Sequence, residues 1–153
     1  MRTSRKDSDL AFPKRHQPSR RERWRRHYRK WRPIVREEVY TRDGGRCRCP
    51  CQRLLELNSD NPWEHANINE NPPRSKGGDP TDRRQCLTFQ KECHALFTAG
   101  RLTYTATDPA LGTDGPVIFE GDLAVSPGHI RGYVSHPVIR HYEGESDGHA
   151  FEG

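Results

Sequence analysis

The chain has 153 residues, enough for one modest domain but not for two full ones. Hydrophobic and charged residues each make up 31% of it, so a large apolar core is excluded and a metal or a partner is expected to support the fold. No apolar run approaches the roughly 20 residues of a membrane helix, and the first ten residues lack the apolar segment of a secretory signal. We therefore expect a soluble, cytoplasmic protein without a membrane partner.

The net charge of +5 is distributed unevenly along the chain. Residues 1–36 contain 14 Lys and Arg residues and three Asp and Glu residues, a net charge of +11, whereas the remainder carries −6. A basic segment of this kind can neutralise nucleic-acid phosphates and release their condensed counterions. Nucleic acid is the favoured partner, and a solubilising disordered tail is the alternative.

An amphipathic helix is predicted to begin at Ser19. Trp24, Tyr28 and Trp31 follow each other at the spacing of one helix face, and Ser19 with Glu22 has the form of a capping box. The aromatic stripe is interpreted first as a face that docks on the domain, and second as a surface on which unpaired bases stack. The basic residues around it are candidates for nucleic-acid contacts: Arg20, Arg21, Arg25, Arg26, Arg29 and Lys30.

Pro33 is expected to break or kink this helix and to lie in the first turn of a second helix. That second helix should end at Asp43-Gly44-Gly45. The pattern of the remaining chain then predicts a cysteine knuckle with a short strand at 46–57, a strand at 63–70, a loop and strand at 81–89, a helix at 93–99, and a hairpin of 101–107 with 116–120.

These elements indicate four segments. They are a disordered basic tail at 1–18, a basic aromatic helix or arm at 19–36, an α+β domain at 37–120, and an irregular C-terminal extension at 121–153.

The segment from Val39 to Leu102, about two-fifths of the chain, resembles the small phage and bacterial HNH endonucleases. The resemblance rests on the order of Arg-Asp-Gly-Gly-Arg-Cys at 42–47, Pro-Arg-Ser-Lys-Gly-Gly at 73–78, Cys-His at 93–94 and Gly-Arg-Leu at 100–102. It implies an α+β fold with a small ββα-metal core, a divalent ion (Mg²⁺, Mn²⁺ or Ni²⁺) and DNA as partner. It also implies a phosphodiester hydrolase, an endonuclease or nickase, working with phage packaging or other nucleic-acid-processing proteins in a bacterial or phage-infected cell.

The catalytic residues of the HNH family correspond to four positions of this chain. The family's strand-end pair falls on Asn69 and Glu70, its central asparagine on Gln85, and its helix histidine on His94. Glu70 matches a His-Glu variant, whereas Asn69 and Gln85 depart from the usual pattern. The resemblance implies that Glu70 is the general base or a metal ligand and that Asn69 and His94 bind the metal. Gln85 would brace the catalytic loop.

General chemistry agrees with these roles. Cleaving a phosphodiester requires an activated water and positive charge near the developing oxyanion, and carboxylate oxygens suit a hard ion. Arg74 and Lys76, beside two glycines that let the backbone approach closely, are candidates for gripping the phosphate, and Arg74 is also a catalytic candidate. His65 shares a strand face with Asn69 and is a distant alternative ligand. The later histidines are expected on the polar surface: His129, His136, His141 and His149.

The five cysteines are odd in number and closely spaced, which indicates metal ligation more than disulfides. Many members of the HNH family carry a structural zinc, so the resemblance implies one here, and such a site would add folding free energy to a domain with a small core. The predicted ligands are Cys51, Cys86 and Cys93, with either Cys47 or Cys49 as the fourth. Unligated cysteines are the alternative.

Three alternatives to a working nuclease remain. A catalytically degenerate HNH-fold module could bind nucleic acid or assist assembly, as the departures at Asn69 and Gln85 suggest. Asn69 could instead be an engineered replacement of the family histidine. Finally, the chain could be a cysteine-rich zinc module that binds protein partners through its acidic C-terminal half.

Overall fold

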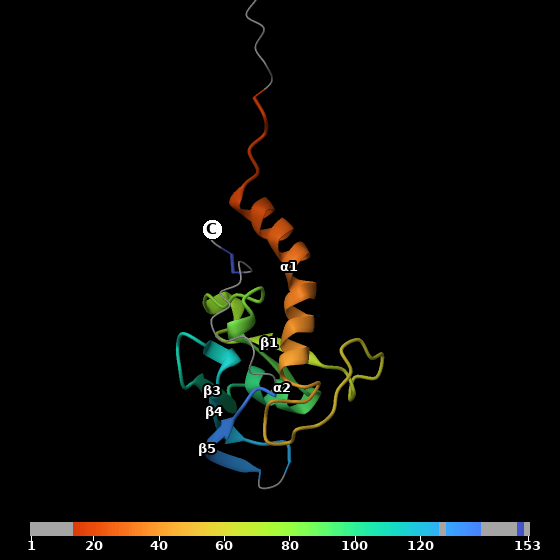
Figure 1. Ribbon diagram of the computed structural model, residues 1–153, viewed down its shortest axis with the longest axis vertical. Coiled ribbons are helices and arrows are strands. Elements are labelled where there is room, and N and C mark those ends of the chain that lie inside the picture. Colours follow the sequence, from red (N-terminus) through yellow and green to blue (C-terminus); the bar gives the residue numbers. More distant parts are fainter. Residues whose placement is uncertain (1–13, 126–127, 139–149, 152–153) are drawn as a thin grey trace, which may run out of the picture.

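The computed structural model describes residues 14–125, 128–138 and 150–151, and it has the mixed α+β architecture that the sequence predicts. The long helix α1 (Arg20–Arg42) extends away from two small antiparallel sheets and the short helix α2 (Lys91–Thr98) (Figure 1). One sheet has the order β1-β2 and the other β3-β4-β5. The strands are β1 Asn67–Glu70, β2 Cys86–Phe89, β3 Leu102–Ala106, β4 Val117–Asp122 and β5 His129–Ser135, and the 3₁₀ turns are η1 Arg74–Lys76, η2 Arg83–Gln85 and η3 Gly112–Asp114.

The start of α1 is the predicted capping box. The Ser19 hydroxyl accepts the backbone N–H of Glu22 at 3.2 Å, and the Glu22 carboxylate accepts the backbone N–H of Ser19 at 3.1 Å. Of the predicted disordered tail, residues 14–18 lack regular secondary structure and residues 1–13 lie outside the described residues. Within the part of the chain that the structure describes, no helix is both long and apolar enough to cross a membrane.

The expected helix break at Pro33 is wrong, because α1 continues through it to Arg42. The boundary expected between residues 36 and 37 therefore falls inside one helix. Contacts on both sides of the proline hold α1 on the domain and offset the lost backbone hydrogen bond. The guanidinium of Arg32 donates to the carbonyl oxygens of Pro80 at 2.8 Å and Ile68 at 2.6 Å, and Val35, one turn later, is fully buried.

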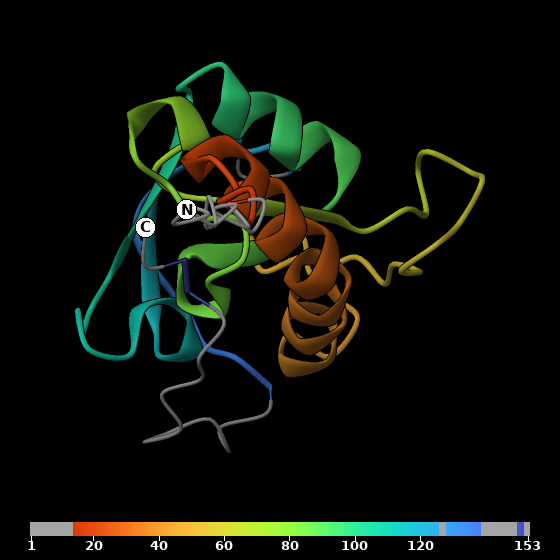
Figure 2. The same ribbon diagram turned by 90° about the horizontal axis from the view of Figure 1, so that it is seen from above.

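The first sheet and α2 follow one another directly. Seen from above, α1 passes in front of β1 and β2, and α2 lies beside it (Figure 2). The strand predicted at 63–70 forms only at Asn67–Glu70, and α2 begins two residues earlier than predicted, at Lys91. The side chain of Gln90 caps α2 by accepting the backbone N–H of Glu92 at 3.4 Å. The segment before β1 is mainly turns and projects from the body as the yellow loop (Figures 1 and 2).

The predicted hairpin is confirmed as β3 and β4, with Tyr104 opposite Phe119. However, the expectation of an irregular extension is wrong for residues 129–135, because β5 pairs antiparallel with β4. The outer edge of β4 would otherwise present unpaired backbone N–H and C=O groups, and β5 satisfies them. Residues 126–127, 139–149 and 152–153 of that extension lie outside the described residues.

An aromatic cluster joins the two sheets into one core. Phe89 of β2, Phe97 of α2, Tyr104 of β3 and Phe119 of β4 have neighbouring ring centroids between 5.4 and 6.1 Å apart. Aromatic pairs at such separations add to the stabilisation from burial. This cluster packs α2 against both sheets.

A buried ionic network lies at the C-terminal end of α1. The guanidinium of Arg42 donates to the carboxylates of Asp43 and Asp114, at 2.9 and 3.0 Å. Arg48 donates to Asp43 at 2.9 Å, and Arg83 donates to Asp114 at 3.0 Å. Burial alone would raise the pKa of Asp43, but the charges of Arg42 and Arg48 outweigh it and lower the pKa. The Arg-Asp pair of the sequence motif is therefore a structural element that joins α1 to the loops.

Candidate functional site

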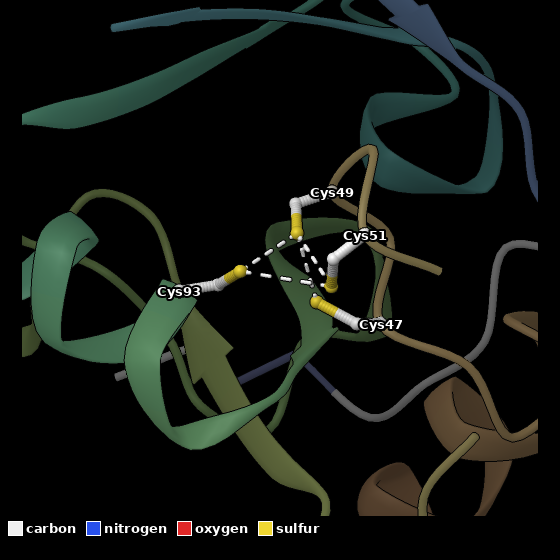
Figure 3. Close-up of side chains that lie close together, drawn as sticks. All are labelled: Cys47, Cys49, Cys51 and Cys93. Atoms are coloured by element: carbon white, nitrogen blue, oxygen red, sulfur yellow. Dashed lines mark hydrogen bonds between the residues drawn. The ribbon is translucent and has the colours of Figure 1, made fainter. Parts of the chain in front are cut away.

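Four cysteines come together in a small group, which we call the cysteine group: Cys47, Cys49, Cys51 and Cys93. Their Sγ atoms all lie within 4.8 Å of one another. Three cysteines come from the loop after α1, and Cys93 points toward them from the first turn of α2 (Figure 3). Cys49 is central, with its Sγ 3.2 Å from Cys47, 3.1 Å from Cys51 and 2.7 Å from Cys93.

The cysteine group is suited to a metal ion such as zinc. Tetrahedral zinc with Zn–S bonds of about 2.3 Å separates its sulfur ligands by about 3.8 Å. The observed separation of Cys51 from Cys93 is 3.8 Å, and the shorter ones need only small side-chain movements to match. The group is also closed, since Cys47, Cys49 and Cys93 are almost fully buried. These are features of a structural site rather than a catalytic one.

The loop conformation explains how cysteines two positions apart reach one side. The chain turns after α1 through Gly44 and Gly45, whose φ angles of +69° and +66° favour glycine. A further turn follows, in which the backbone N–H of Gln52 donates to the carbonyl of Cys49 at 3.1 Å. Arg48, between two of the cysteines, points away from them into the buried network around Asp43.

The thiols of Cys47 and Cys51 titrate unequally. Burial raises the pKa of Cys47, whereas hydrogen bonds from Cys47, Cys49 and Cys93 lower the pKa of Cys51. Cys51 therefore gives up its proton before Cys47, whose thiol resists ionisation in the absence of a cation. A divalent ion would remove that resistance, because metal binding displaces thiol protons.

Cys86, a predicted zinc ligand, is not part of the cysteine group. Its Sγ lies 3.3 Å from the carbonyl oxygen of Asp82 and 3.9 Å from a guanidinium nitrogen of Arg32. Burial raises its pKa to about 12, so it stays a protonated thiol. The sequence predicted either Cys47 or Cys49 as a ligand, but both belong to the cysteine group, and the second of them replaces Cys86. The signal in the sequence was the Cys-x-Cys-x-Cys run itself.

The predicted strand-end pair lies at the end of β1. Asn69 pairs with Leu87 and Glu70 with Cys86, and directly paired residues share a face of the sheet. Consecutive residues alternate, so Asn69 and Glu70 point to opposite faces. Asn69 shares its face with Leu87 and Phe89, the face that packs against α2.

His94 is half-buried on α2, directly after Cys93 of the cysteine group. Burial lowers the pKa of His94, and the negative charge of Glu70 opposes that shift. Glu70 and His94 are thus electrostatic neighbours across the β1–α2 junction. That Asn69, Glu70 and His94 share one ion stays a prediction.

Gln85 lies at the end of η2, immediately before β2, so within the loop and strand predicted at 81–89 it belongs to the loop. Its side-chain oxygen accepts the backbone N–H of Asp79 at 2.9 Å, and its side-chain nitrogen donates to the carboxylate of Asp82 at 3.2 Å. The amide therefore spans the loop between η1 and η2. The sequence pattern had not marked Asp79 or Asp82 as its partners.

Arg74 and Lys76 lie in η1, and both are exposed. The Arg74 guanidinium packs over the rings of Trp24 and Tyr28 on α1, 4.8 and 5.8 Å from their centroids. Gly78 permits the tight turn after η1, because a Cβ on it would lie 1.6 Å from the carbonyl oxygen of Pro72. The turn thus packs Arg74, a residue predicted to bind phosphate, against α1. The sequence did not reveal this packing.

The basic residues of α1 are exposed: Arg20, Arg21, Arg25, Arg26, Arg29 and Lys30. The aromatic stripe is half-buried, and the neighbouring His27 ring shares a 2.8 Å hydrogen bond with the hydroxyl of Thr81. These contacts agree with the docking interpretation of the stripe. The arginines around it remain accessible to a partner.

The other histidines lie elsewhere. His65 and Asn67 line a separate cavity of about 360 Å³ with Lys91. His129 and His136 are exposed, as expected for polar surface, whereas His141 and His149 lie outside the described residues.

The chain matches no protein-family model, and no curated protein or solved structure is significantly similar to it.

Proposed function

We propose that this protein is a metal-dependent HNH-type endonuclease or nickase acting on DNA, with a structural zinc in the cysteine group. One observation carries the proposal: the first turn of α2 holds Cys93, which belongs to the cysteine group, and the next residue is His94, whose pKa is influenced by the charge of Glu70. The antiparallel β1–β2 pair followed by α2 is the order of elements expected for a ββα-metal core. A zinc in the cysteine group would then fix the helix turn that carries a catalytic residue.

In this proposal each residue has a distinct role. Glu70 accepts a proton from the attacking water, and Asn69 and His94 face the same ion from β1 and α2. Gln85 supports the loop beside the site through Asp79 and Asp82. The exposed cations of η1 and α1 hold the phosphate backbone.

A divalent ion would acidify a bound water and stabilise charge on the scissile phosphate. Within the described ranges, the cysteine group is the one set of three or more His, Cys, Asp and Glu side chains whose ligand atoms lie together. The catalytic ion would therefore have few protein ligands, Asn69 and His94, with Glu70 beside it as the base. Mg²⁺ tolerates such a site, because it retains several waters and takes substrate phosphate oxygens.

Conversion of supercoiled plasmid to nicked circles tests the proposal, with Mg²⁺, Mn²⁺ and Ni²⁺ supplied in turn. Glu70→Gln keeps the shape of the side chain but removes the base, and it should slow nicking at least about a hundredfold. The matched control is Glu64→Gln, on an exposed residue before β1, which should nick at the wild-type rate. Equal nicking by wild type and Glu70→Gln would reject Glu70 as the base.

The second candidate function is a non-catalytic module that binds nucleic acid. It is favoured by Asn69, whose amide oxygen is a weaker ligand than the imidazole or carboxylate usual at this position. Salt-sensitive DNA binding without nicking by any of the three metals would support it. The Asn69→His variant would then show why nicking is absent. If the site lacks only one metal ligand, the histidine should restore nicking, whereas a site that has lost its other catalytic features should stay inactive.

A further inference from the structure

Two cavities meet along the N-terminal half of α1, at the side chains of Trp24 and Arg74. The first has a volume of about 500 Å³ and the second about 590 Å³, within the range of roughly 300 to 1,000 Å³ that is usual for ligand sites. The first is also lined by Arg25, Arg26, Tyr28 and Arg29, and the second by Arg20, Arg21, Gly77 and Phe151. We call the two together the α1 groove.

The indole of Trp24 is a surface on which flat groups pack. The guanidinium carbon of Arg74 lies over the indole, 4.8 Å from its centroid, and the ring of Phe151 makes a T-shaped contact with it at a centroid separation of 5.0 Å. Both groups come from distant parts of the sequence. A planar cation and a remote aromatic ring therefore already share this indole, and a nucleobase offers the same kind of π-face.

The charge around Trp24 suits a phosphate backbone. Arginines predominate on both sides of it, and the acidic residues lining the cavities are Glu22 and Asp79. Asp79 is already engaged, since its carboxylate accepts hydrogen bonds from Thr81 and from the backbone N–H of Phe151. The α1 groove thus alternates an aromatic surface with arginine side chains, which suit phosphates.

This alternation distinguishes between the two forms of DNA. In a duplex the base faces are stacked on each other, so an aromatic side chain in a groove of the protein meets only phosphates and sugars. An unpaired strand exposes its base faces, which stack on aromatic rings and guanidinium planes. We propose that the α1 groove binds a single-stranded DNA segment, with one base stacked at the Trp24–Arg74 pair and the flanking phosphates in the two arginine-lined cavities.

This inference rests on the proposed function and adds to it, because it states that the protein binds single-stranded rather than double-stranded DNA. Fluorescence anisotropy tests it with a labelled oligo(dT) of about 12 nucleotides and a labelled hairpin duplex. No divalent ion is added, so no cleavage is required. Trp24→Ala should weaken oligo(dT) binding about tenfold or more and change duplex binding by less than about twofold. Arg74→Lys keeps the charge but removes the plane, so it should lose a similar share of the oligo(dT) affinity.

Trp63→Ala is the matched control, because Trp63 is 43% exposed and packs on Lys91 rather than on the α1 groove. It should leave both affinities unchanged. The proposal is overturned if Trp24→Ala weakens oligo(dT) and duplex binding equally, or weakens neither. Trp24→Phe retains an aromatic ring and should keep most of the wild-type affinity for oligo(dT). It therefore tests the proposal if Trp24→Ala fails to fold. A protein that never nicks but shows Trp24-dependent oligo(dT) binding would reject the nuclease and keep this inference.

Discussion

The Sγ atoms of Cys49 and Cys93 lie 2.7 Å apart, although the two residues are 44 positions apart in the sequence. This contact joins the loop after α1 to the first turn of α2 and encloses β1, β2 and both turns between them. Holding two such distant segments together by ligands to one ion restricts the unfolded chain and stabilises the folded one. A metal ion held by the cysteine group would therefore stabilise the whole middle of the chain.

Zinc content should depend on the four residues of the cysteine group and not on the total number of cysteines. Wild-type protein should contain about one zinc per chain, and chelation should lower its melting temperature by about 10 °C or more, since structural zinc contributes folding free energy directly. Cys49→Ser should reproduce both losses, whereas Cys86→Ser should keep the zinc because its thiol faces Asp82. Metal analysis and thermal melts measure this. An unchanged melt after chelation would exclude the structural zinc.

Asp43 should be one of the most sensitive positions for stability. It is 1% exposed and pairs with Arg42 and Arg48, so Asp43→Asn leaves two buried guanidinium groups without their shared counter-charge. Breaking a buried pair of this kind costs about 3–5 kcal/mol in the free energy of unfolding. Urea denaturation should show that loss. The exposed Asp60 provides the control, and Asp60→Asn should change stability by about 0.5 kcal/mol or less.

The same carboxylate should contribute to acid unfolding. The pKa of Asp43 is lower in the folded protein than in the unfolded chain, so its contribution is present above about pH 4, the unfolded value, and is lost as the pH falls through the lower folded value. Denaturation between pH 3 and pH 6 should therefore show stability falling at the acid end. The fall should be shallower in Asp43→Asn, which has no proton to take up there. Identical slopes in the two proteins would contradict the assignment.

Gly78 and Gly77 should respond differently to alanine. A Cβ on Gly78 would collide with the backbone of Pro72, whereas a Cβ on Gly77 meets no atom within 4 Å and only strains a φ angle of +90°. We expect Gly78→Ala to cost about 3 kcal/mol or more and Gly77→Ala about 1–2 kcal/mol in the free energy of unfolding. Thermal melts of the two variants decide this, and equal costs would show that the turn after η1 can relax.

Much of the secondary structure follows from local pattern. The capping box at Ser19 is a contact between near neighbours, and the β3–β4 hairpin was predicted from two strand-like segments, 101–107 and 116–120, that are close in the sequence. Pro33 misled because local propensity predicts a break, while burial of Val35 and the hydrogen bonds of Arg32 keep α1 continuous. Tertiary contacts outweigh one missing helix hydrogen bond.

The candidate sites show the same division. The cysteine spacing indicated a metal, but it wrongly included Cys86 among the ligands and offered Cys47 and Cys49 as alternatives, whereas both belong to the cysteine group. That choice depends on where β2 directs the Cys86 thiol and on the turn that follows Cys49. The packing of Arg74 on Trp24 could likewise not be predicted from the sequence, since the two residues meet only when η1 folds back against α1.

By itself the sequence determined an α+β protein with a basic aromatic helix, a cysteine-rich turn and an ordered set of candidate catalytic residues, because residue type and spacing express periodicity, capping and charge. Tertiary structure alone decided which four thiols meet, that Asn69 and Glu70 point to opposite faces of the sheet, and that Arg42 and Asp43 are buried. Those outcomes depend on contacts between segments far apart in the chain, whose geometry is set by packing and by the pairing of buried polar groups.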